Sequence, residues 1–186
     1  MNIRSALATC AVAALVLFCP AARPEAQAQI AAPITFDQTL LDRWLEVFPA
    51  VMRTTKPDAT PMSEQAGQEF IERICAKAGF ASYDQCAEVF FYAGMIMSAC
   101  DRKSRSFRDP IKLMRRQIAK IEANAALSPV QKGKATAKFK EVVARFPDNI
   151  PEAHLRLMTA NRDRIFQIVI HAGADLSAQP DGWENW

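Results

Sequence analysis

The sequence predicts an all-α fold, a bundle of about six helices in which one helical hairpin is cross-linked by a disulfide. β-branched residues are sparse, and no segment alternates apolar and polar residues with the period of two that is typical of strands. Apolar residues recur instead with helical spacing in successive segments. Short stretches that contain Pro, Gly, Ser or Asp separate these segments and indicate the connections between helices.

The N-terminal segment predicts export from the cytoplasm. Residues 1–28 combine a positively charged start, an apolar run of 13 residues over 6–18, and the small-x-small cleavage signal Ala26-Gln27-Ala28. The apolar run is too short to span a membrane, which takes about 20 residues. Lipidation of Cys19 is an alternative, although Phe18 is bulkier than the residue that lipoprotein signals carry there. We therefore expect a cleaved signal peptide and a periplasmic or secreted protein.

The remaining chain is expected to form one domain with no transmembrane segment. Removal of the signal peptide leaves 158 residues, a length typical of a single domain. Residues 29–173 hold all the helical patterns, and we interpret them as one helical domain. Residues 174–186 are expected to form a flexible C-terminal tail, in which Trp183 and Trp186 could also dock on the body or on a partner.

Start and stop signals define the first three helices. The first is expected to end or kink at Pro49, because proline lacks the N–H that helix interiors need. The second is expected to start at Thr60-Pro61, an N-cap followed by proline, and to end at Gly79. The third begins at Ser82, whose hydroxyl and the Gln85 side chain form a predicted capping box.

Capping residues also place the later helices. Asp109-Pro110 opens the fourth helix, and Ser128-Pro129 with Gln131 opens the fifth by the same capping chemistry. The sixth is expected to start near Pro151 and to run without interruption until Gly173.

Two cysteines occupy matching positions in the hairpin between the second and third helices. Cys75 lies four residues before Gly79, and Cys86 lies four residues after Ser82. In an antiparallel pair these positions are level, and close helices allow the Cα separation of about 5–6 Å that a bridge needs. We predict a Cys75–Cys86 disulfide that contributes about 2–3 kcal/mol. The alternative is two buried thiols that never oxidise.

Cys100 is the third cysteine of the mature chain. Fourteen residues of helix separate it from Cys86 by about 21 Å, which excludes a bridge between them. Cys100 is therefore interpreted as a buried free thiol. An intermolecular disulfide, or a bridge in which Cys100 replaces Cys86, remains open.

Charge is segregated along the chain. Residues 29–100 hold 5 Lys or Arg and 9 Asp or Glu, whereas residues 101–145 hold 13 and 4, and residues 146–186 hold 3 and 6. The middle segment is therefore strongly basic between two acidic ones.

The fourth helix is the most basic amphipathic segment. Its cations fall on the face opposite its isoleucines, and the basic loop before it extends them. We predict an anion-binding surface for lipid headgroups, lipopolysaccharide phosphate or an acidic protein. Nucleic acid is not expected, because few aromatics are interleaved with the cations. The alternative is an ordinary solvated face. The candidate residues are Arg108, Lys112, Arg115, Arg116 and Lys120.

The sequence contains no recognisable catalytic motif. It has two histidines, no Cys-x-x-Cys, and no nucleophile, phosphate-binding or zinc-protease signature. We therefore expect a binding protein rather than an enzyme and predict no cofactor or metal. The rival hypothesis is a carrier of a small hydrophobic ligand in a soft cavity of the bundle core. The candidate lining residues are Phe70, Phe90, Met95, Met97, Met114, Phe139 and Met158.

One short motif adds a third hypothesis. Leu127-Ser128-Pro129-Val130-Gln131 resembles the Leu-Thr-x-x-Gln motif of Spy-like periplasmic chaperones, with Ser in place of Thr and a single occurrence. The resemblance covers five residues and implies chaperone activity. Helix capping alone also explains Ser, Pro and Gln at these offsets.

Overall fold

The computed structural model describes residues 34–54, 63–101, 104, 106–146 and 148–172, and this part of the chain is all-α, as predicted. The expected signal peptide, residues 1–28, and the expected tail, residues 174–186, lie outside the described residues. The described helices are α2 (Gln38–Thr54), α3 (Glu64–Lys77), α4 (Tyr83–Ser98), α5 (Pro110–Ala123), α6 (Pro129–Arg145), α7 (Glu152–Ala160) and α8 (Arg162–His171).

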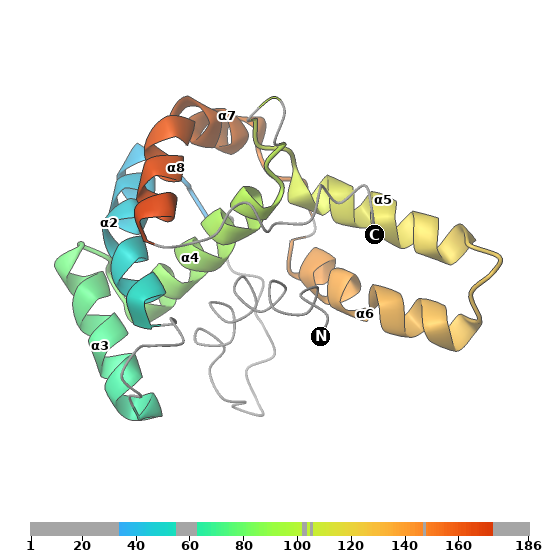
Figure 1. Ribbon diagram of the computed structural model, residues 1–186, viewed down its shortest axis with the longest axis horizontal. Coiled ribbons are helices and arrows are strands. Elements are labelled where there is room, and N and C mark those ends of the chain that lie inside the picture. The colour runs from blue at the N-terminus through green and yellow to red at the C-terminus, as the bar shows by residue number, and fades with distance from the viewer. Residues whose placement is uncertain (1–33, 55–62, 102–103, 105, 147, 173–186) are drawn as a thin grey trace.

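The helices form a body and a projecting hairpin (Figure 1). In the body, α2 packs against α3, α4 and α8, and α7 precedes α8 at one end. Helices α5 and α6 pack mainly against each other and extend away from the body. The loop that joins α5 to α6 lies farthest from the body, and most side chains of these two helices are exposed or only partly buried.

The core lies between α2, α4 and α8. Trp44 of α2 is fully buried, and its ring contacts those of Phe48 and Phe90 at centroid distances of 5.2 and 6.3 Å. Burying an aliphatic or aromatic side chain of this size contributes about 1.5–3 kcal/mol each. Packing of these apolar faces therefore holds the body together. The other large side chains with the least exposure include Leu41, Leu45, Val51, Ile96, Ile165 and Val169.

Helix α2 does not end at Pro49, so of the two expected alternatives, an end or a kink at this proline, the end is wrong. It continues through Pro49 to Thr54. Phe48 and Val51 are buried on the two sides of Pro49, so core packing offsets the hydrogen bond that proline cannot donate. Helix α3 begins later than expected, with Ser63 as its N-cap. The expected start at Thr60-Pro61 lies outside the described residues.

The turn between α3 and α4 forms the predicted hairpin. The N–H of Gly79 donates to the Ala76 carbonyl at 3.0 Å, and the N–H of Phe80 donates to the Cys75 carbonyl at 3.1 Å. This is a Schellman ending, which needs a left-handed residue, and Gly79 supplies it with φ of 84°. The Cys75–Cys86 disulfide is confirmed, with Cα atoms 6.0 Å apart.

The predicted N-caps are present at α4, α5 and α6. Ser82 accepts from the Gln85 N–H, but the Gln85 side chain accepts from the N–H of Ala81 rather than from that of Ser82. Asp109 caps α5, and Ser128 with Gln131 forms a complete capping box at α6.

The expectation of one continuous sixth helix is wrong, because the structure has two helices in its place. Asn161 divides it into α7 and α8, with φ of −98° and ψ of 8°. The Asn161 side-chain amide donates to the Leu157 carbonyl and to Gln38 Oε1 of α2, each at 3.0 Å. A short polar side chain that bonds to nearby backbone competes with the helical ladder. The break turns the chain so that α8 packs along α2.

Candidate functional site

The candidate site is the projecting pair of α5 and α6, residues 110–145, which we call the basic hairpin (Figure 1). Its two helices hold each other through partly buried apolar side chains, among them Phe139 and Val143 of α6. Thr136 is the fully buried side chain of α6, and its hydroxyl donates to the Lys132 carbonyl at 2.9 Å. Because the pair has little core of its own, most of its surface is available for contact.

The basic hairpin carries nine Lys or Arg residues and two Asp or Glu residues. One of the two acids is already neutralised, because Glu122 pairs with Lys140 at 2.7 Å. The Lys132 ammonium also donates to the Glu122 carbonyl oxygen at 2.8 Å, near the end of α5 where cations interact favourably with the helix dipole. The remaining cations give this projecting element a strong positive potential.

Three of the five predicted anion-binding residues form a row on the outer face of α5. Lys112, Arg116 and Lys120 are exposed and follow each other at intervals of four residues, or about 6 Å along the helix. Within the described part of the chain, none of the three side chains has an ion pair or hydrogen bond. We call these residues the α5 basic row.

The other two predicted residues lie apart from this row and have intramolecular partners. Arg108 pairs with Asp101 in the connection between α4 and α5. Arg115 is half-buried and donates to Asn149 Oδ1 at 2.8 Å and to the Phe146 carbonyl at 3.5 Å. Both guanidinium groups therefore help to fix the base of the basic hairpin, where α5 leaves the body and α6 returns to it.

Sequence reasoning did not single out the cations of α6. Lys134 and Lys138 are exposed and four residues apart, so they share the outer face of α6. Arg145 lies at the base, with its guanidinium 4.6 Å from the centre of the Phe91 ring, a cation–π contact. The four-residue spacing of Lys134 and Lys138 is the sequence signal that indicates a basic face on α6.

A hydrogen-bonded pair, Tyr92 and His154, connects α4 to α7. The Tyr92 hydroxyl lies 2.7 Å from His154 Nδ1, and both rings contact Phe36. Burial raises the pKa of Tyr92, with a smaller contribution from the Asp109 carboxylate, and burial lowers the pKa of His154. Both side chains are therefore uncharged at neutral pH. Tyr92 is buried in the core and His154 is partly buried, so the hydrogen bond joins two helices.

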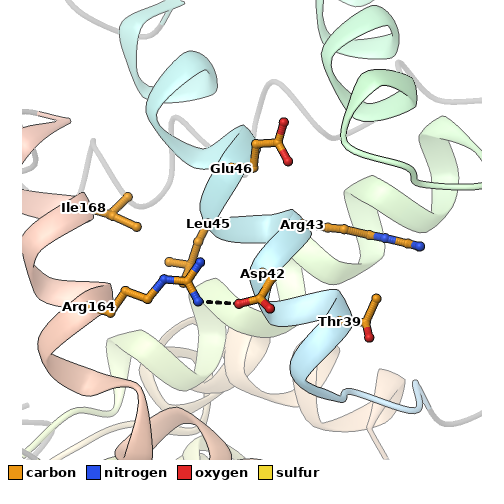
Figure 2. Close-up of a pocket in the computed structure, with 7 residues that line it drawn as sticks. All are labelled: Thr39, Asp42, Arg43, Leu45, Glu46, Arg164 and Ile168. Atoms are coloured by element: carbon orange, nitrogen blue, oxygen red, sulfur yellow. Dashed lines mark hydrogen bonds and ion pairs between the residues drawn. The ribbon is translucent and has the colours of Figure 1, made fainter.

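An open groove of about 520 Å³ lies between α2 and α8. Figure 2 shows Arg164 of α8 reaching Asp42 of α2, while Arg43 points to the far side of α2. Burial raises the pKa of Asp42, but hydrogen bonds from Arg164 and Gln38 outweigh it and hold this pKa below its ordinary value. The charged groups facing each other in this groove thus neutralise one another.

A second groove lies beside it, lined by Pro49, Arg53 and Ile168, among others. Neither groove is lined by the methionines and phenylalanines that the carrier hypothesis requires. Among the described residues, His, Cys, Asp and Glu side chains do not gather in a group of three that could hold a metal ion. No described helix combines the length and the apolar character needed to cross a bilayer.

Comparison of the chain with protein families, with functionally characterised proteins and with solved structures finds no match. The resemblance to Spy-like chaperones therefore rests on its five residues. In the structure, Ser128 and Gln131 of that motif form the capping box of α6.

Proposed function

We propose that the protein is a secreted or periplasmic binding protein without catalytic activity, and that its basic hairpin contacts an anionic partner. The observation that carries this proposal is the excess of nine basic over two acidic residues on an element that projects from the body. Like charges on neighbouring turns destabilise a helix. An anionic partner would relieve this repulsion, so the charge pattern favours a binding role over a purely structural one.

The α5 basic row supports an extended anion rather than a single small one. From Lys112 to Lys120 the row covers about 12 Å, and its side chains are not occupied by described residues. Phosphate and carboxylate groups on lipid headgroups, on lipopolysaccharide or on an acidic protein share the chemistry that such a row recognises.

The disulfide supports the proposed location outside the cytoplasm, because disulfides persist mainly in oxidising compartments. The proposal includes removal of residues 1–28, and N-terminal sequencing of the exported protein tests it directly. A mature chain that begins at Gln29 is expected, whereas a retained leader would contradict this part of the proposal.

The test uses heparin, a soluble polyanion, and two matched variants. The first carries Lys112→Glu, Arg116→Glu and Lys120→Glu, and the control carries Arg53→Glu, Lys77→Glu and Arg156→Glu on exposed positions of the body. Both change net charge by the same amount, and circular dichroism checks that both remain helical.

The proposal predicts that the hairpin variant elutes from heparin at much lower salt than the wild type, while the control shifts little. Electrostatic binding must also weaken as salt rises, whereas binding of an apolar ligand would not. Equal losses in both variants would contradict the proposal, because net charge rather than the basic hairpin would then govern binding.

A further inference from the structure

The geometry of the basic hairpin points to a specific partner, and we infer that the hairpin docks end-on against an anionic phospholipid membrane. Its tip, residues 123–131, enters the interfacial layer, and the lysines behind the tip contact headgroup phosphates. This inference rests on the proposed anion-binding function and names the partner.

The tip differs chemically from the rest of the basic hairpin. Residues 123–131 contain no charged side chain, although the flanking positions are Glu122 and Lys132. Val130 is 66% exposed, and the other large hydrophobic residue so exposed in the described part of the chain is Ile170 of α8, at 59%. Ala125 and Ala126 of the tip are also exposed. An uncharged tip with one exposed hydrophobic side chain, on a cationic extension, suits a surface that combines anionic headgroups with a hydrocarbon layer.

Lys120 and Lys134 lie at the distance from the tip that such docking requires. Lys134 follows Val130 by one turn on the same face of α6, about 6 Å farther from the tip. Lys120 lies one turn before the end of α5. Interfacial elements bury their apolar parts about 5–10 Å deep, which places both lysines level with the phosphates. Their hydrocarbon stems can extend along the interface while the ammonium groups reach the phosphates.

The distribution of charge favours a membrane over an acidic protein. Next to the tip, Lys120 is exposed on the outer face of α5 and Lys134 is exposed on the outer face of α6. A folded protein partner would contact one side of this extension. A layer of headgroups surrounds an inserted tip on all sides, so it contacts the lysines of both helices at once.

The experiment measures binding of the purified protein to phosphatidylcholine vesicles with and without phosphatidylglycerol. Val130→Ser tests the tip, and Ile170→Ser is the matched control. Val130→Ser is expected to weaken binding to the anionic vesicles about fivefold to tenfold, because it replaces the apolar side chain that enters the membrane. Ile170→Ser should change the same binding less than about twofold.

A second measurement reports the depth of the tip directly. A tryptophan introduced as Val130→Trp should be quenched by brominated phosphatidylglycerol vesicles more strongly than the native tryptophans. Ile170→Trp should show no added quenching. This readout does not depend on how much affinity the serine variant loses.

The outcomes separate this inference from the proposed function. Binding to anionic vesicles that depends on Val130, together with quenching at position 130, supports the inference. Two results overturn the membrane inference and leave the proposed function standing, provided that the α5 basic row still controls retention on heparin. The first is the absence of vesicle binding. The second is vesicle binding in which Val130→Ser equals the wild type and position 130 shows no quenching. If the α5 basic row affects neither heparin nor vesicle binding, both are overturned.

Discussion

The guanidinium of Arg115 in α5 donates a hydrogen bond to Asn149 Oδ1, 2.8 Å away in the connection that leads from α6 to α7. The contact joins the two ends of the basic hairpin at its base, where the Arg115 guanidinium also donates to the Phe146 carbonyl. Arg115 therefore positions the hairpin, whereas its neighbour Arg116 belongs to the exposed α5 basic row. Adjacent arginines on one helix thus have different roles because they face different directions.

This difference predicts that substitution of Arg115 lowers stability, whereas substitution of Arg116 weakens heparin retention. Arg115→Ala should lower the free energy of unfolding by about 1–2 kcal/mol, because it removes hydrogen bonds from a charged donor. Arg116→Ala should change that free energy by less than about 0.5 kcal/mol and should weaken heparin retention. Urea unfolding followed by circular dichroism measures the first effect. Equal stability of the two variants would show that the Arg115 contact does not hold the base.

The disulfide between α3 and α4 predicts a defined loss of stability when it is removed. A variant with Cys75→Ser and Cys86→Ser should lose about 3 kcal/mol of unfolding free energy, because the open chain regains the entropy of a short loop. The control is Cys100→Ser, which alters a half-buried free thiol and leaves the bridge intact. Chemical denaturation of both proteins checks the comparison, and a larger loss in the control would contradict the assignment.

Cys100 should react slowly with alkylating reagents. Burial raises the pKa of its thiol above the ordinary value of 9.0, so the reactive thiolate is scarce at neutral pH. The rate of iodoacetamide modification should therefore rise through a midpoint above pH 9.0. A midpoint below that value would show that the thiol is activated and would contradict this prediction.

The Tyr92–His154 pair predicts a loss of stability in mild acid. Burial lowers the pKa of His154 below its usual 6.5, so the unfolded chain binds the imidazole proton more readily than the folded protein. The free energy of unfolding should therefore fall as pH decreases below about 6.5 and should level off below the lowered pKa.

His154→Gln should remove this component of the pH dependence, and His171→Gln, which alters an exposed side chain at the end of α8, should retain it. Thermal unfolding across this pH range provides the measurement. An unchanged profile in His154→Gln would mean that another group is responsible.

Local chemistry in the sequence predicted the starts of α4, α5 and α6 and the disulfide, because capping residues and cysteine positions act within a few residues. It did not predict the ends that depend on packing. Helix α2 passes Pro49 because buried neighbours hold it, and α7 ends at Asn161, whose side chain bonds partly to Gln38, far away in the chain.

The candidate site was predicted only in part, because sequence patterns report local geometry and not contacts between distant residues. Helical periodicity placed Lys112, Arg116 and Lys120 on one face. It could not show that Arg108 and Arg115 have partners, since Asp101 and Asn149 are brought to them by turns in the chain. Nor could it show that α5 and α6 project as a pair, which depends on which faces the body leaves uncovered.

The most direct test of the central claim is a lysine acetylation footprint of the wild-type protein, mapped by mass spectrometry with and without phosphatidylglycerol vesicles. All the lysines compared are exposed before binding. End-on docking predicts protection of Lys120 and Lys134, the exposed lysines next to the tip of the basic hairpin, with unchanged labelling of Lys77 on α3. Protection of Lys77, or hairpin lysines labelled as in the free protein under conditions where the protein is bound, would contradict it.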